Sequence, residues 1–369
     1  MSAVRERKEY LSEQLITYLG NKRNLLGFIV AAVEEVRVKL GKEKISVFDL
    51  FSGSGIVARC LKQFAESIAV NDLERYSEVI NRCYLSNEDE LPMRDLNEAY
   101  RWLCDGLGEE NLRAGWITEL YSPRNETAVD RGERCFYTPR NARYLDTARR
   151  RIEELPEEFQ PYFLAPLLAE ASVHANTSGV FKGFYKNRET GIGQYGGSGR
   201  NALSRILGAI EVKMPVFSRF SCPFRVFRGD ATAVAAVAGE FDLAYIDPPY
   251  NQHPYGANYF MLNLLTDYRR PESVSTVSGI PRDWNRSEWN RRGQAVEQMR
   301  HLAEAVDAKF LLISFNSEGF ISLPEMTALL ERIGSVKVTE TAYNAFRGSR
   351  NLKARNLHLK EYLFLVEKK

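Results

Sequence analysis

Apolar and polar residues follow two different periods near the start of the chain. Residues 25–40 repeat apolar positions at helical spacing and stop at Gly41, which predicts a helix with a glycine cap. Residues 45–51 form a β-branched and aromatic run, followed by a glycine turn, a helix of about ten residues and a short strand at 67–70. This succession is typical of a βαβ unit in a parallel, doubly wound sheet.

The middle of the chain has a helical pattern instead. Thr138 followed by Pro139 is typical of an N-cap and a first helical position, and predicts a helix through residue 154. A second helix is predicted at 158–174. A glycine-rich, basic stretch with interleaved aromatic residues follows at 176–200.

Strand-like runs resume only in the second half. They lie at 224–230, 241–246 and 310–315, and a helix at 324–333 precedes two closing strands at 336–343 and 359–366. Over 150 residues separate the strand end at Asp72 from the one at Asp230, whereas a crossover needs about a dozen or a little more. The sequence therefore predicts an α/β fold with a doubly wound, mostly parallel sheet. Residues 1–86 and 222–369 form its main domain, and residues 87–221 form a large insertion.

Composition fits this organisation and excludes some classes. The chain has 369 residues, enough for two domains or one domain with an insertion. No apolar run approaches the roughly 18 residues that span a bilayer, and the first residues lack an apolar signal core, so we expect a cytoplasmic protein without a membrane segment. Five cysteines form no CxxC pair, which argues against a disulfide framework and a structural zinc site, and we expect no metal.

Charge is unevenly distributed along the chain. Residues 181–229 hold nine Lys or Arg against two acids, whereas residues 88–110 hold eight acids against two Arg. A basic segment can bind a polyanion such as nucleic acid, although a solvated protein face has the same composition. Candidate DNA contacts in this segment are Lys182, Lys186, Arg188 and Arg200.

The most distinctive turn is Asp247-Pro248-Pro249-Tyr250, at the end of the run 241–246. Two prolines remove two backbone donors and fix φ, so the chain leaves the sheet with acceptor groups turned outward beside an aromatic ring. Such a site suits a planar group that carries an exocyclic amine, for example a nucleobase. A strand that simply ends in a proline-rich turn is the alternative.

The first glycine turn predicts a nucleotide site. Gly53 and Gly55 follow a strand and open a helix, and Asp72 lies nineteen residues after Gly53, where an acid can bind ribose hydroxyls. With Ala58 the turn satisfies G-x-G-x-x-A, so an NAD-dependent dehydrogenase is a competing hypothesis. The Asp247 turn and the basic insertion favour S-adenosylmethionine instead, with further contacts expected from Asp49 and Asp230.

Seven short motifs occur in one order along the chain. They are Tyr18-Leu19-Gly20-Asn21-Lys22, Asp49-Leu50-Phe51-Ser52-Gly53-Ser54-Gly55, Asn71-Asp72, Phe136-Tyr137-Thr138-Pro139, Ala175-Asn176-Thr177-Ser178-Gly179, the Asp247 turn and Glu361-Tyr362-Leu363-Phe364. In this order the chain resembles the D12-class DNA N6-adenine methyltransferases, the group that includes the Dam methylases, in their alpha arrangement. The insertion is longer than in the smaller Dam enzymes, which leaves the DNA sequence that it reads open.

The resemblance implies a Rossmann-like S-adenosylmethionine-dependent methyltransferase fold and specific roles. Cofactor contacts are implied for Tyr18, Lys22, Phe51, Gly53, Asp72 and Asp230, catalysis for Asp247, Pro248, Pro249 and Tyr250, and target recognition for the insertion. Asp49 and Gly55 join the expected cofactor set because they belong to the glycine turn and the strand end before it. The implied reaction is methyl transfer to N6 of an adenine flipped out of double-stranded DNA. A cognate restriction endonuclease is a candidate partner, and we expect a monomer.

Two alternatives within methyl transfer remain. An RNA base or a protein glutamine also presents a planar amine to turns of this type. A cytosine-C5 enzyme is disfavoured because it needs a nucleophilic cysteine, usually in Pro-Cys, and none of the fourteen prolines precedes a cysteine. Candidate residues of lesser weight are His253, Tyr255, Tyr259 and Phe260 near the turn, and Arg347, Arg350, Lys353 and Arg355 before the last strand.

Overall fold

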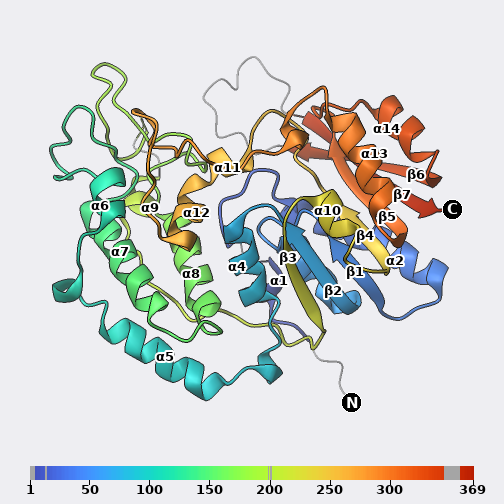
Figure 1. Cartoon of the computed structure of the whole chain (residues 1–369), viewed down its shortest axis with the longest axis horizontal. Coiled ribbons are helices and arrows are strands. Elements are labelled where there is room, and N and C mark those ends of the chain that lie inside the picture. Colours follow the sequence, from blue (N-terminus) through green and yellow to red (C-terminus); the bar gives the residue numbers. More distant parts are fainter. Residues whose placement is uncertain (1–4, 13–14, 198, 200–201, 345–357) are drawn as a thin grey trace.

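The protein is built on one seven-stranded sheet (Figure 1). A computed structural model describes residues 5–12, 15–197, 199, 202–344 and 358–369. The strands are β1 (Ile45–Asp49), β2 (Ala65–Asp72), β3 (Phe224–Arg228), β4 (Phe241–Ile246), β5 (Ala308–Asn316), β6 (Gly334–Asn344) and β7 (His358–Lys368), in the order β3-β2-β1-β4-β5-β7-β6. Strand β7 runs antiparallel to both of its neighbours, β5 and β6, and the other described strand pairs are parallel, which confirms the predicted mostly parallel sheet.

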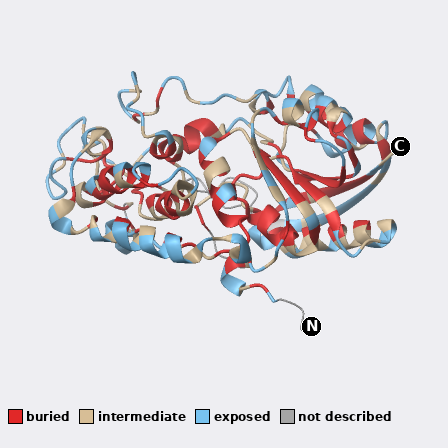
Figure 2. Cartoon of the chain, turned by 60° about the horizontal axis from the view of Figure 1, so that its bottom comes forward, coloured by how far each residue is buried: buried red, intermediate tan, exposed pale blue. Residues whose placement is uncertain are grey.

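Both faces of the sheet are covered by helices (Figure 2). On β1, Val47 packs into one core with α2 (Leu26–Leu40) and α3 (Ile56–Leu61), whereas Phe48 packs into the opposite core with α10 (Ala231–Ala235), α13 (Ala295–Ala305) and α14 (Leu323–Leu330). Successive residues of a strand point to opposite faces, so a strand buried on both faces is mostly apolar. All six residues of β4 are buried for this reason.

A helical region lies beside the β3 edge (Figure 1). Its helices are α4 (Arg75–Tyr84), α5 (Met93–Asp105), α6 (Trp116–Tyr121), α7 (Pro139–Glu153), α8 (Gln160–Val173), α9 (Leu203–Leu207), α11 (Tyr255–Asn258) and α12 (Phe260–Asp267). One apolar cluster joins α4, α7, α8 and α12. The helical core thus includes α4 and α12, which lie outside residues 87–221, and the domain boundaries remain a prediction.

Local signals explain where several elements begin. Thr138 Oγ1 accepts a hydrogen bond from the Asn141 amide at 3.1 Å and Pro139 opens α7, which confirms the predicted cap. Gly41 is left-handed, with φ +64°, and ends α2 as predicted.

No helix within the described ranges is long and apolar enough to cross a membrane.

The helices differ from prediction in several places. The helix after Gly55 has six residues rather than about ten, because a 3₁₀ turn at Lys62–Phe64 leads into β2, which is longer at both ends than expected. Helix α5 was also not predicted, and Leu96 and Leu103 are the buried residues of this otherwise half-buried or exposed surface helix. Met93, Leu96, Tyr100 and Leu103 do recur at helical spacing, so the sequence carries the pattern of this helix. The short α1 (Lys8–Ser12) was likewise not predicted.

Candidate active site

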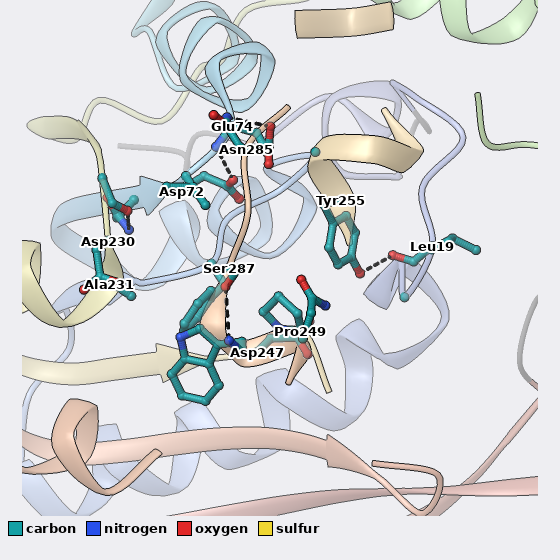
Figure 3. Close-up of a pocket in the computed structure, with 18 of the residues that line it drawn as sticks. Leu19, Asp72, Glu74, Asp230, Ala231, Asp247, Pro249, Tyr255, Asn285 and Ser287 are labelled. Atoms are coloured by element: carbon teal, nitrogen blue, oxygen red, sulfur yellow. Dashed lines mark hydrogen bonds between the residues drawn. The ribbon is translucent and has the colours of Figure 1, made fainter. Parts of the chain in front are cut away.

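A pocket lies where the carboxyl ends of β1, β2, β3 and β4 meet (Figure 3). This is the edge at which open α/β sheets bind ligands. Residues at or just after the ends of these four strands supply part of its walls, and three further segments, residues 18–20, 255–256 and 285–290, supply the rest. The lining residues are Tyr18, Leu19, Gly20, Phe51, Asn71, Asp72, Leu73, Glu74, Gly229, Asp230, Ala231, Asp247, Pro249, Tyr255, Gly256, Asn285, Ser287, Trp289 and Asn290.

The glycine turn after β1 is shaped by close contacts. Gly53 has φ +51°, and a Cβ there would lie 2.7 Å from a ring carbon of Tyr18. Its amide donates to Asp72 Oδ2 at 2.8 Å, while Asp72 Oδ1 accepts from the Glu74 amide at 2.9 Å. Gly55 has φ +72°, and its Cβ would meet the Asn81 side chain at 2.7 Å. The turn therefore requires glycine at both positions and fixes the Asp72 carboxylate at the pocket wall.

The loop before the 3₁₀ helix η1 (Lys22–Leu25) is held against α11 and the residue after it by tyrosines. The Tyr18 ring stacks on Tyr259 with centroids 4.8 Å apart and lies 5.0 Å from the Tyr255 ring. The Tyr259 hydroxyl accepts from the Leu19 amide at 2.7 Å, and the Tyr255 hydroxyl donates to the Leu19 carbonyl at 3.0 Å (Figure 3). Tyr255 and Tyr259 thus fix the position of this wall of the pocket.

Asp247 ends β4 and pairs with a buried lysine. Lys22 Nζ lies 2.9 Å from Asp247 Oδ1 and 3.2 Å from Glu361 Oε1. Burial raises the pKa of Asp247 to about 6, with the positive charge of Lys22 opposing the rise and the negative charge of Glu361 adding to it. Burial lowers the pKa of Lys22, but the carboxylates of Asp247 and Glu361 outweigh this effect and hold it well above its usual value. Lys22 therefore stays a cation beside the turn.

The rest of the turn is rigid. The Tyr250 carbonyl accepts from the Phe320 amide at 2.9 Å, and its ring meets Phe315 edge-on at 6.0 Å. Lys22 Nζ lies 5.8 Å from the centroid of the Tyr250 ring. Pro248 is buried, and Pro249 faces the pocket. Tyr250 thus lies beside the Lys22–Asp247 pair.

Two further acids follow the strand ends. Asp230 caps α10 by accepting from the Thr232 and Ala233 amides, each at 3.1 Å, and also lines the pocket. Asp49 is buried at the end of β1, where burial and the negative charge of Asp247 raise its pKa well above the usual range. Its Oδ2 atom has no hydrogen-bond partner among the residues that the structure describes.

The basic segment lies apart from the pocket walls but is anchored near them. Lys182 and Arg188 are exposed, and Lys186 Nζ lies 4.9 Å over the Phe184 ring. The buried Asn176 organises this segment by donating to the Cys135 and Gln194 carbonyls at 2.7 and 2.8 Å. Arg200 lies outside the described residues, as do Arg347, Arg350, Lys353 and Arg355. His253 is an exposed loop residue.

Comparison with known families decides between the open hypotheses. The family model described as D12 class N6 adenine-specific DNA methyltransferase matches residues 18–329. The chain belongs to this family. Membership confirms the predicted DNA adenine methyltransferase and its donor S-adenosylmethionine, and it sets aside the dehydrogenase and the RNA or protein methyltransferase.

Curated relatives agree with the family. The chain is similar to the Type II methyltransferase M.NlaIII of Neisseria lactamica, with 28% identity over 96% of this chain and 99% of the relative. M.CviAII of Paramecium bursaria Chlorella virus 1 is 30% identical over 95% of this chain and 98% of the relative. M.FokI of Planomicrobium okeanokoites is 25% identical, and the match covers 95% of this chain but 52% of M.FokI.

The pocket of this family member fits the methyl donor. Acceptors at Asp72 and Asp230 suit ribose hydroxyls and an exocyclic amine, and Phe51 and Trp289 supply flat surfaces, with ring centroids 5.3 Å apart. Trp289 Nε1 is buried and has no protein acceptor in the described part of the chain. These groups match a nucleoside with polar edges.

The structure brings together most of the predicted residues, but not all in the expected places. Tyr18, Phe51, Asp72, Asp230, Asp247 and Pro249 line the pocket, whereas Lys22, Asp49, Gly53, Gly55, Pro248 and Tyr250 lie behind the walls. The closest contacts of Lys22 are with Asp247 and Glu361. A cofactor role of Lys22 therefore stays a prediction.

One wall was missed entirely by sequence reasoning. Asn285, Ser287, Trp289 and Asn290 come from a long loop between α12 and α13. Asn285 donates to Glu74 Oε2 at 3.1 Å, and Asn290 donates to the Asn251 carbonyl at 2.8 Å. The sequence does carry a signal, because Trp-Asn-Arg occurs twice, at 284–286 and 289–291.

Proposed function

We propose that the Asp247 turn holds the amine of an adenine rotated out of double-stranded DNA while its N6 receives the methyl group. The supporting observation is that Asp247 lines the pocket and begins the turn that leads to Tyr250. The amine lone pair is delocalised into the ring, so the nitrogen is a weak nucleophile. Hydrogen bonds to the Asp247 carboxylate and the Pro248 carbonyl favour a tetrahedral nitrogen, and Tyr250 stacks on the base.

S-adenosylmethionine supplies an electrophilic methyl group on a sulfonium sulfur. In this proposal Asp72 accepts from the ribose, Asp230 accepts from the adenine amine of the donor, and Phe51 faces its ring. The complete proposed cofactor set is Tyr18, Lys22, Asp49, Phe51, Gly53, Gly55, Asp72 and Asp230. Gly53 and Gly55 act by allowing close approach of backbone, and Tyr18 acts by closing the glycine turn.

DNA contact is proposed for the inserted region, residues 87–221. The exposed Lys182 and Arg188 and the neighbouring Lys186 offer positive charge to phosphates, and Arg200 belongs to the same set. Because the Phe181 amide donates to the Asn258 carbonyl at 2.7 Å, this segment is tied to α11, which follows the Asp247 turn. DNA bound to this segment would therefore be linked to the Asp247 turn through one short helix, α11.

The biological setting is also a proposal. The relatives M.NlaIII and M.CviAII are Type II methyltransferases, so a cognate restriction endonuclease is the proposed partner of this chain in the cell. We further propose that the enzyme acts as a monomer in the cytoplasm, where its DNA substrate is found.

Long-read sequencing of DNA from cells that express the protein tests this proposal. We expect N6-methyladenine in one short sequence motif, and its loss in Asp247→Ala. Asp307→Asn is a matched control, because this exposed carboxylate lies just before β5, at the end of the sheet opposite the pocket. Unmodified adenine throughout, or full methylation by Asp247→Ala, would contradict the proposal.

A further inference from the structure

A buried cluster of three charged groups lies behind the Asp247 turn. The Lys22 ammonium bridges Asp247 and Glu361 at 2.9 and 3.2 Å, and the side chains of Lys22 and Glu361 are only 4% and 1% exposed. Two carboxylates and one ammonium leave one net negative charge in the cluster. Burying an unbalanced charge is costly, so a fold that retains it needs a compensating use.

The cluster joins distant parts of the chain. Lys22 begins η1, Asp247 follows β4, and Glu361 lies on β7, paired with Asn316 of β5 and Thr341 of β6. The Ser314 hydroxyl of β5 donates to Glu361 Oε1 at 2.7 Å and fixes the orientation of this carboxylate. The Glu361-Tyr362-Leu363-Phe364 motif was recognised in the sequence, but no chemical role followed from it there.

We propose that Glu361 is a positioning residue for methyl transfer, which shares the Lys22 ammonium with Asp247 and thereby keeps Asp247 a strong acceptor for the adenine amine. This inference rests on the proposed function of the Asp247 turn. Glu361 acts through Lys22, at a distance from the pocket, since it does not belong to the pocket lining.

The electrostatic reason lies in the charge that develops during the reaction. Lys22 paired with Asp247 alone would neutralise the carboxylate and withdraw electron density from the atoms that accept from the amine. N6 bonds to the methyl carbon while the carbon–sulfur bond breaks, and its electron pair stays on the sulfur of the departing S-adenosylhomocysteine. Positive charge therefore moves onto N6, which then loses a proton to water. A cluster that keeps one net negative charge stabilises this change more than a neutral pair does, because a buried site screens charge weakly.

The same arrangement predicts a characteristic pH dependence. Asp247, Lys22 or both interact electrostatically with five titratable groups around them. These groups are Glu361, Asp49, Tyr245, Tyr250 and Tyr255. Asp247 must be ionised to pair with the Lys22 ammonium and to be a strong acceptor for the adenine amine, so activity falls as the pH drops through its pKa of about 6. Removing the negative charge of Glu361 removes a repulsion, so the pKa of Asp247 falls and the acid limb of activity moves to lower pH.

Glu361→Gln in the full-length enzyme, assayed on duplex DNA with S-adenosylmethionine, tests the inference. We expect kcat to fall at least about tenfold, KM for both substrates to change less than about threefold, and the acid limb of kcat to shift down by roughly half a pH unit or more. Glu340→Gln is the control, because Glu340 is an exposed acid facing Tyr362 across the β6–β7 pair. It should behave as wild type.

Three outcomes would overturn the inference: an unchanged kcat, an acid limb that does not move, or a loss of activity matched by an equal loss of S-adenosylhomocysteine binding. If Glu361→Gln does not fold, Ser314→Ala keeps the charge while releasing the carboxylate, and should lower kcat with the acid limb in place. An unchanged kcat in Ser314→Ala would then contradict the inference. Asp247→Asn assayed in parallel distinguishes the role of Glu361 from the proposed role of the Asp247 turn. Full activity of Asp247→Asn would refute the proposed function itself.

Discussion

The Tyr18 ring lies so close to Gly53 that a Cβ on residue 53 would come within 2.7 Å of a ring carbon. Tyr18 lies before η1 and lines the pocket, whereas Gly53 follows β1 and lies behind the pocket wall. Their contact joins the N-terminal loop to the glycine turn, while the Gly53 amide holds Asp72 at 2.8 Å. Three predicted cofactor residues, Tyr18, Gly53 and Asp72, therefore contact one another, and moving one of them should displace the others.

Substituting Gly53 should disrupt this unit. Gly53→Ala forces the Tyr18 ring away and strains a backbone with φ +51°, so we expect affinity for S-adenosylhomocysteine to fall about tenfold or more in titration calorimetry. Gly27→Ala is the control, because Gly27 lies inside α2 with nothing within 4 Å of its Cβ position. That variant should bind normally and be slightly more stable. Equal binding by both variants would contradict the account.

Trp289 should contribute to cofactor binding through its ring and through its indole N–H, which has no acceptor among the residues that the structure describes. Trp289→Phe keeps an aromatic surface against Phe51 but removes Nε1–H, and we expect it to weaken S-adenosylhomocysteine binding by about 1–2 kcal/mol. Calorimetry at constant pH measures the change. The matched variant Trp102→Phe alters a 40% exposed residue on α5 and should leave affinity unchanged. No difference between the two variants would place the cofactor elsewhere.

Asp247 should cost stability at neutral pH. Burial raises the pKa of Asp247 in the folded protein to about 6, above its usual value. The folded state therefore favours the protonated carboxyl, and the stability that this protonated group contributes is fully present below the unfolded pKa. That stability is lost as the pH rises through about 6, because the buried carboxyl must then ionise. Asp247→Asn cannot ionise and leaves Lys22 paired with Glu361. We expect it to raise the unfolding free energy by roughly 1–3 kcal/mol at pH 8, and the gain to shrink toward pH 4.

Chemical unfolding at the two pH values measures this difference. Asp283→Asn, at an exposed loop position, should show no comparable gain at either pH. A variant Asp247→Asn that is less stable than wild type at pH 8 would show that the ionised carboxylate is a net stabiliser of the fold.

The basic segment should govern the salt dependence of DNA binding. Lys182→Ala and Arg188→Ala each remove one exposed charge, so the slope of log affinity against log salt should decrease by about one for each phosphate that the variant no longer neutralises. Fluorescence anisotropy with a duplex measures the slope. Lys39→Ala, on α2, is a control that removes an exposed charge paired with Glu367. An unchanged slope in both segment variants would locate the DNA on another surface.

The sequence predicted what is local in this structure. The β1 to β2 unit, the Thr138 cap and the Asp247 turn each depend on neighbouring residues, and the ordered motifs pointed to the correct family. The wall formed by Asn285 and Trp289 was missed because a loop without periodicity reaches the pocket only through tertiary packing. The pairing of Lys22 with Asp247 and Glu361 was missed for a similar reason, since electrostatic partners far apart in sequence leave no local pattern.

Transfer of a labelled methyl group tests the central claim most directly. The purified protein is incubated with duplex DNA and S-adenosylmethionine labelled in its methyl group, and the nucleosides are separated and identified by mass spectrometry. We predict that the label appears in N6-methyladenine, and that Asp247→Asn reduces it by at least about a hundredfold. Label in another nucleoside, or equal labelling by Asp247→Asn, would contradict this account.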